Sequence, residues 1–184
     1  MLERANAKIV TVSAFPVPAD ENYFDPRTLE MIEVDFQTYL ARARVHDGWN
    51  IIRESSDLTA IMADRELRGL ILHIEGLNVL PDPLWPKLEA WYRLGWRSLG
   101  LVWNLTNPLG GGTLDAETTL TPLGRELVAW LSAHRMIIDY AHMNAPTFRE
   151  VAALTSGPIL VSHGNARACC DSPRNYDDQQ LKLI

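Results

Sequence analysis

The sequence predicts an α/β fold whose strands form a parallel (β/α) barrel. Short apolar runs alternate with amphipathic stretches of helical period along the chain. The apolar runs are nearly continuous, as in RGLILHIEG, which is typical of parallel strands that are buried on both faces. With 184 residues, of which 47% are hydrophobic and 22% charged, the chain has the size and composition of one globular unit. We therefore expect a single domain over residues 1–184.

The first half of the chain contains three of the expected strands. The expected elements are a strand at 8–15, a helix at 27–44, a short strand at 49–52, a helix from Ser56 or Asp57 to about Leu67, and a strand at 68–76. The first helix is indicated by apolar side chains at three- and four-residue spacing, at Leu29, Ile32, Phe36 and Leu40. The second is indicated by side chains that can cap a helix.

The second half continues the alternation. The expected elements are a helix at 84–94, strands at 97–103, 136–142 and 158–163, a helix at 121–135, and a helix from Pro146 to Gly157. Thr121 can cap the helix that Pro122 opens, and a glycine such as Gly157 commonly follows a helix end. The chain thus supplies five to six of the eight strands that close a barrel, and we expect an incomplete one.

Polar side chains stand where these strands end. Glu75, Asn104, His142 and His163 each close an apolar run. In a parallel barrel all strands end on the same face, which carries the chemistry. Two histidines and a carboxylate on that face are suitable ligands for zinc.

The net charge and the hydropathy of the chain limit the kinds of partner that it can bind. No apolar segment is long enough to span a membrane. The formal charge is −6, and Lys and Arg are not clustered, which argues against nucleic acid and anionic membranes. The start of the chain lacks the basic and long apolar regions of a secretory signal. We therefore expect a cytoplasmic protein with neither nucleic acid nor a membrane as its partner.

Four segments carry a resemblance to a known family. LHIEG, GWRSLGLVWNLTN, LTPLGRELVAWLSAHRMIIDYAHMN and PILVSHGNARACCDSPRNYDD follow one another with gaps similar to those of the renal (membrane) dipeptidase family of zinc peptidases. The resemblance implies an α/β barrel of the metal-dependent hydrolase type that holds two zinc ions and hydrolyses dipeptides. It also implies a homodimer, since many members form one.

The resemblance assigns roles to individual residues. Glu75 matches the catalytic carboxylate that bridges both metals. His142, in DYAHM, and His163, in SHGNAR, match metal ligands. Arg174, in SPRNYDD, matches the arginine that binds the substrate carboxylate, a task that suits its planar fork of donors.

The chain departs from the family pattern within the same site. It contains no His-x-Asp pair, which supplies further metal ligands in the family. Trp103 stands where the family has a substrate-contacting histidine, next to Asn104, and we count both among the substrate-binding residues. His73 lies two residues before Glu75 and so faces the same side of the strand, where it is a candidate extra ligand. We expect one or two zinc ions here.

Three functions remain open. The first is a zinc-dependent dipeptidase in which a metal-activated water attacks the peptide bond, with the open edges of the incomplete barrel covered by a complementing chain or a second copy. The second is a noncatalytic relative that binds a peptide or a single metal. The third is a barrel hydrolase acting on another amide, with a pocket that Trp103 reshapes.

Overall fold

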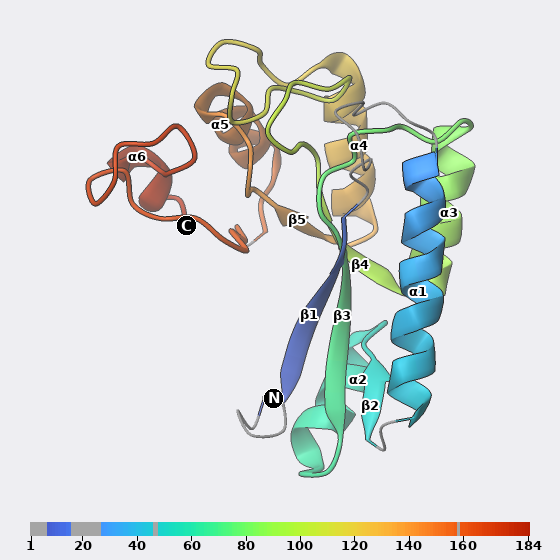
Figure 1. Cartoon of the computed structure of the whole chain (residues 1–184). Helices are drawn as coiled ribbons and strands as arrows, with labels where there is room; N and C mark the ends of the chain where they lie inside the picture. Colours follow the sequence, from blue (N-terminus) through green and yellow to red (C-terminus); the bar gives the residue numbers. More distant parts are fainter. Residues whose placement is uncertain (1–6, 16–26, 46–47, 158) are drawn as a thin grey trace.

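The computed structural model describes residues 7–15, 27–45, 48–157 and 159–184 (Figure 1). Its strands are β1 (Ile9–Ala14), β2 (Trp49–Ile51), β3 (Arg68–Ile74), β4 (Trp96–Gly100) and β5 (Ile137–Asp139). Its helices are α1 (Arg27–Val45), α2 (Ser55–Ala63), α3 (Leu84–Leu94), α4 (Pro122–Ala133), α5 (Ala145–Leu154) and α6 (Asp178–Leu181).

The strands form one parallel sheet in the order β1-β3-β4-β5, and β2 pairs with the first residues of β3. A single parallel bridge between Asp139 and Leu160 continues the sheet beyond β5. Helices pack on the strands, and α1 and α3 lie side by side, with an ion pair between Lys87 and Glu33 (Figure 1). The predicted α/β fold with a parallel sheet is confirmed.

The two faces of this sheet differ in chemistry. Side chains that alternate along a strand point to opposite faces, and paired residues share a face. The face toward the helices is apolar and buried at Leu72, Ile74, Leu99 and Ile138. These side chains join one core with residues of the helices: Ile32, Phe36, Leu88, Trp91, Leu127, Leu131, Phe148 and Val151. The other face is the inner face, and it carries polar side chains at Ser13, His73, Ser98 and Asp139.

Caps define the helix starts, and one differs from the prediction. Thr121 and Asn144 accept hydrogen bonds from the backbone N–H groups of Gly124 and Thr147, and so begin α4 and α5. The helix that Ser56 or Asp57 was expected to cap begins at Ser55 instead, because its N-cap residue Glu54 forms a reciprocal capping box with Asp57.

That helix also ends earlier than the expected Leu67. Asp64 is extended, and its side chain accepts a hydrogen bond from the N–H of Glu66. The ammonium group of Lys8 donates to the carbonyl groups of Asp64 and Leu67. These contacts turn the chain directly into β3.

The later strands are shorter than their apolar runs. After β4, the carbonyl of Leu101 accepts hydrogen bonds from the side-chain amide of Asn107 and from the N–H of Leu77, which lies beyond the end of β3. After β5, the Asp139 carboxylate accepts hydrogen bonds from the N–H groups of Ala141 and Ser162. The strand expected at 158–163 therefore contributes only its bridge at Leu160, and residue 158 lies outside the described residues.

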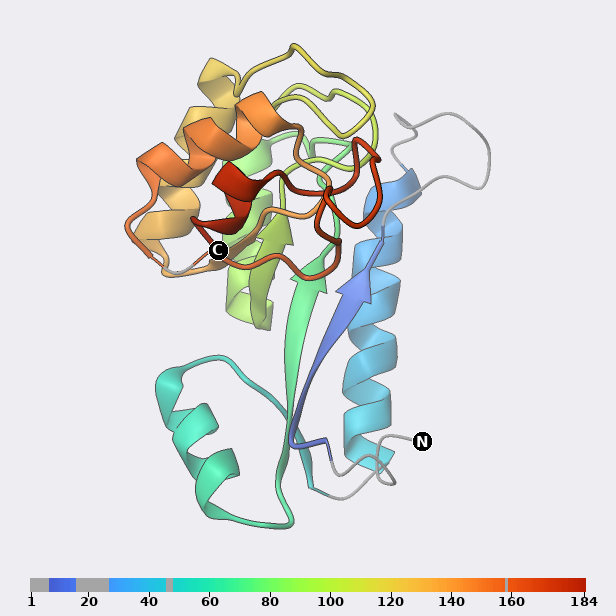
Figure 2. The ribbon, with the colours of Figure 1, turned by 90° about the vertical axis from the view of Figure 1, so that its left-hand side faces the viewer.

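All strands run toward one end of the sheet. Figure 2 shows β1 and β3 pointing toward the end where the segments after β4 and after α5 gather. Among the residues that the structure describes, no helix is long and apolar enough to cross a bilayer.

Candidate metal and substrate site

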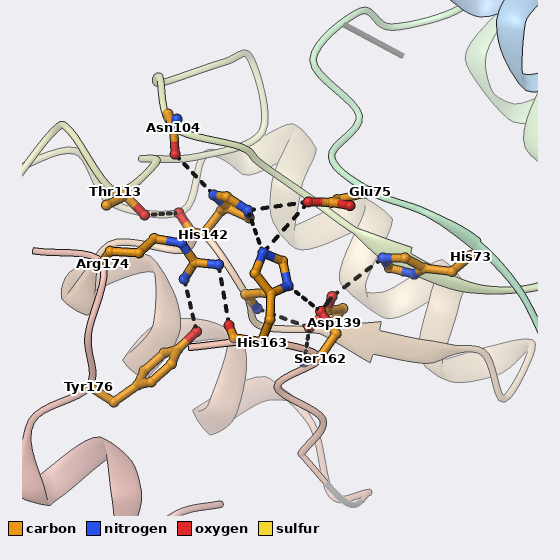
Figure 3. A network of polar contacts seen from close by, with 11 residues as sticks. His73, Glu75, Asn104, Thr113, Asp139, His142, Ser162, His163, Arg174 and Tyr176 are labelled. Atoms are coloured by element: carbon orange, nitrogen blue, oxygen red, sulfur yellow. Dashed lines mark hydrogen bonds and ion pairs between the residues drawn. The ribbon is translucent and has the colours of Figure 1, made fainter. Parts of the chain in front are cut away.

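Three predicted site residues converge at the carboxyl end of the sheet (Figure 3). Glu75 directly follows β3, His142 follows β5, and His163 follows the bridged segment at Leu160. Oε1 of Glu75 lies 3.4 Å from Nε2 of His142 and 3.7 Å from Nε2 of His163. One ligand atom from each residue lies within 4.8 Å of the others, so the three can hold one metal ion.

The site is open on one side. The side chain of His142 is 7% exposed, that of Glu75 23% and that of His163 48%. A water molecule or a substrate can therefore approach the cluster from the side of His163.

The backbone of His142 adopts an unusual conformation. Its φ is 67°, in the left-handed region that side chains disfavour. The hydroxyl of Thr113 donates to the carbonyl of His142 at 3.0 Å, and Gly112 forms a bridge with Met143. The loop after β4 thus supports a strained backbone that aims the imidazole at Glu75.

Asn104 orients the ring of His142. Its Oδ1 lies 3.0 Å from Nδ1 of His142. A carbonyl oxygen can only accept, so a neutral His142 carries its proton on Nδ1 and leaves the Nε2 lone pair facing the cluster. Asn104, which we expected to bind substrate, thus supports a candidate ligand, and its contact with substrate stays a prediction.

The electrostatics favour the forms that bind metal. When the His142 ring is charged, it donates from Nε2 to Glu75, and this hydrogen bond lowers the pKa of the Glu75 carboxyl against the effect of its burial, with smaller effects of the charges on His163, His142 and His73. Burial lowers the pKa of His142, and the charge of Arg174 lowers it further. At neutral pH the cluster thus offers a carboxylate and an unprotonated imidazole, as a divalent cation requires.

Arg174 lies beside this cluster. Its guanidinium donates to the carbonyl of His163 at 3.2 Å and to the hydroxyl of Tyr176 at 3.4 Å (Figure 3). Burial raises the pKa of Tyr176, so its hydroxyl stays protonated. The structure therefore brings the predicted carboxylate-binding residue next to the candidate ligands.

The aromatic ring of Trp103 packs against one side of the site. Its ring centroid lies 5.6 Å from that of His142 and 5.1 Å from that of Phe15, the latter edge to face. The residue expected to contact substrate thus packs against a candidate ligand.

His73, the candidate extra ligand, lies outside the converging group. Its ring is buried on the inner face, with Nδ1 2.9 Å from Oγ of Ser98 and Nε2 3.4 Å from Oδ2 of Asp139. Asp139 in turn accepts a hydrogen bond of 2.5 Å from the hydroxyl of Ser162.

Three residues near the site were not predicted from the sequence: Asp139, Ser162 and Thr113. A signal was present for Asp139, because a carboxylate inside the apolar run MIIDYA has to be paired when it is buried. No comparable signal marked Thr113, which reaches the site only through the folding of a long loop.

A parallel α/β sheet with a metal-ligand cluster at the carboxyl ends of its strands is the arrangement of barrel enzymes. The family model described as membrane dipeptidase (peptidase family M19) matches residues 2–184. The chain belongs to this family, as the resemblance implied.

Relatives and solved structures agree with this assignment. An uncharacterized protein in the pqqA 5' region of Klebsiella pneumoniae is 35% identical over 137 residues, which cover 71% of this chain and 50% of that protein. The crystal structure of dipeptidase AC, a metallo peptidase of family M19, is 25% identical with a TM-score of 0.87 over 100% of this chain and 58% of its own.

A third likeness concerns the fold alone. A metallo peptidase from Rhodobacter sphaeroides, liganded with a phosphinate mimic of the dipeptide L-Ala-D-Ala, is 24% identical with a TM-score of 0.87, covering 100% of this chain and 60% of its own. The chain spans about half the length of the curated relatives it matches.

Proposed function

We propose that this chain carries the metal-binding part of a zinc-dependent dipeptidase. The observation that carries the proposal is the convergence of Glu75 Oε1 with the Nε2 atoms of His142 and His163. Two histidines and one glutamate with an open fourth position are a known ligand set of catalytic zinc. Zinc bound there would supply a water of lowered pKa and polarise the scissile carbonyl.

The other side chains support a short substrate with a free carboxylate. Arg174 presents a guanidinium next to the cluster, and such a group binds a carboxylate through two parallel hydrogen bonds. A substrate fixed by its carboxylate at Arg174 would place a nearby amide at the ligands, which favours a dipeptide. The wall of Trp103 and Phe15 would exclude water from one side of that amide.

The test is hydrolysis of dipeptides by the purified chain with added zinc, compared with the same dipeptides carrying an amidated carboxyl group. We expect hydrolysis that a chelator abolishes and that Glu75→Gln lacks. Arg174→Gln should raise KM for free dipeptides and change it little for the amides. Arg93→Gln, on the exposed face of α3, is the matched control.

The outcomes separate the alternatives. Hydrolysis that survives both the chelator and Glu75→Gln would contradict the metal-dependent mechanism. Tight zinc binding without hydrolysis of any dipeptide would contradict catalysis by this chain and favour the noncatalytic relative. Hydrolysis that prefers amides without a free carboxylate would favour the alternative of a hydrolase for another amide.

A further inference from the structure

We propose that Asp139 is a positioning residue that acts through Ser162 to fix the ring of His163 in the tautomer with a free Nε2. The inference rests on the proposed function in one respect, which is that the free Nε2 would coordinate the metal ion. The tautomer itself is a property of the metal-free chain.

Polar contacts connect Asp139 to His163 through the hydroxyl of Ser162 (Figure 3). The hydroxyl of Ser162 lies 2.5 Å from Oδ2 of Asp139 and 2.9 Å from Nδ1 of His163. The opposite ring nitrogen of His163, Nε2, is the one that faces Glu75 and His142.

The direction of each hydrogen bond follows from the charge of Asp139. Burial alone would raise the pKa of this carboxyl, but the close contact with His73 and the hydrogen bonds from Ser162 and Ala141 outweigh it and lower the pKa to about 2. An ionised carboxylate only accepts, so the Ser162 hydroxyl must donate to it. The hydroxyl oxygen then accepts from His163, whose proton must lie on Nδ1.

Asp139 is itself held firmly. Its Oδ1 accepts two backbone N–H groups, those of Ala141 and Ser162, both at 3.0 Å. The buried ring of His73 lies 3.4 Å from its Oδ2 and is held from behind by Ser98. The carboxylate therefore has a fixed position on the inner face, with one oxygen directed at Ser162.

The isosteric substitution Asp139→Asn should reverse the direction of the hydrogen bonds that connect residue 139, Ser162 and His163. In Asp139→Asn, Oδ1 remains an oxygen because it accepts the two backbone N–H groups, so the amide nitrogen takes the place of Oδ2. That nitrogen donates to Ser162, whose hydroxyl is then free to donate to Nδ1 of His163. The proton of the neutral ring moves to Nε2, where it blocks metal binding.

The experiment is nitrogen NMR of the metal-free chain with 15N-labelled histidine at pH 8, above the ordinary histidine pKa of about 6.5. We expect His163 to be protonated on Nδ1 in the native chain and on Nε2 in Asp139→Asn. Ser162→Ala, which leaves Asp139 in place, should abolish the preference for Nδ1. Asp171→Asn makes the same change at an exposed position and should leave the tautomer as in the native chain.

Two further measurements keep the result interpretable. Circular dichroism and thermal unfolding show whether each variant folds. The comparison is repeated in a His142→Ala background, because Nε2 of His142 lies 3.0 Å from that of His163 and can compete for its proton. An unchanged tautomer in folded Asp139→Asn and Ser162→Ala, in this background as well, would overturn the proposal.

Zinc titration separates this proposal from the proposed function. Loss of a partner that orients a metal-binding histidine typically lowers metal affinity about 10- to 100-fold, and we expect this for both variants. A tautomer that changes while zinc affinity stays constant would uphold the role of Asp139 and contradict His163 as a ligand. An unchanged tautomer would overturn the role of Asp139, whatever the zinc affinity.

Discussion

The Nε2 atoms of His142 and His163 lie 3.0 Å apart, and Oε1 of Glu75 lies within 3.7 Å of both. The other ring nitrogen of His142 faces the carbonyl oxygen of Asn104. In its neutral form His142 therefore has no Nε2 proton to share, and a lone pair and a carboxylate face each other at short range. A cation between these groups would relieve their repulsion.

Zinc should stabilise the folded chain. A ligand that binds only the native state at 100 times its Kd adds about 2.7 kcal/mol to the free energy of unfolding. We expect the Tm to rise with zinc in the native chain and to stay constant in His163→Ala, as thermal unfolding with and without zinc will show. A Tm that responds equally in both chains would mean that zinc binds elsewhere.

The amide of Asn104 should contribute to metal affinity without touching the metal. Asn104→Ala removes the acceptor that keeps the proton of His142 on Nδ1, and we expect zinc affinity to fall about 10- to 100-fold. Asn104→Asp retains an acceptor oxygen and is the control that should retain most of the affinity. Equal affinities for the native chain and Asn104→Ala, measured by competition with a zinc-binding dye, would contradict this role.

Protonation of the Asp139 carboxyl should lower the free energy of unfolding at acidic pH. Its pKa is about 2 in the folded chain against an ordinary value of 3.8. Because the pKa is lowered by folding, this carboxylate adds to the free energy of unfolding at every pH above its ordinary pKa. The added stability is lost as the pH falls toward 2, and the free energy of unfolding decreases by about 2 kcal/mol.

Denaturant unfolding between pH 6 and pH 2 checks this prediction. The native chain should lose more stability below pH 4 than Asp139→Asn, because the variant has no carboxyl to protonate at that position. Parallel stability curves for the two chains would contradict the hydrogen-bonded role of this carboxylate.

Gly164 should not tolerate a side chain. Its φ is 152°, and a Cβ there would lie 2.4 Å from the ring of Tyr176, which contacts Arg174. Gly164→Ala should therefore cost about 1–3 kcal/mol in the free energy of unfolding and disturb the position of Arg174.

Gly157 offers a matched control for that substitution. A Cβ at Gly157 would meet nothing within 4 Å, so Gly157→Ala should leave stability nearly unchanged in denaturant unfolding. Equal stabilities for the two alanine variants would show that Tyr176 yields to the added methyl group.

The sequence predicted that the candidate ligands lie close together, although the later strands end before the predicted positions. Glu75, His142 and His163 each close an apolar run, and parallel strands carry such residues to the same edge of the sheet. Their convergence could be predicted because it depends on the shared direction of parallel strands, and their binding of metal stays a prediction. The same logic placed His73 and Glu75 on one face, yet it could not show that His73 turns toward Asp139.

Contacts between distant loops could not be predicted. Asn104 reaches His142 because the chain leaves the sheet after Gly100, and the resulting loop is held by side-chain hydrogen bonds such as that from Asn107 to Leu101. The segment at 158–163 looked like a strand, but at Ser162 its backbone bonds to a side chain. Such competition between side chains and backbone leaves no periodic pattern in the sequence.

The most direct test of the metal site is the zinc content of the purified chain, measured by elemental analysis after loosely held metal has been removed. A site with three protein ligands predicts about one zinc ion per chain, and Glu75→Gln should retain far less. A native chain without zinc, or one whose zinc content equals that of Glu75→Gln, would contradict the metal site that Glu75, His142 and His163 form.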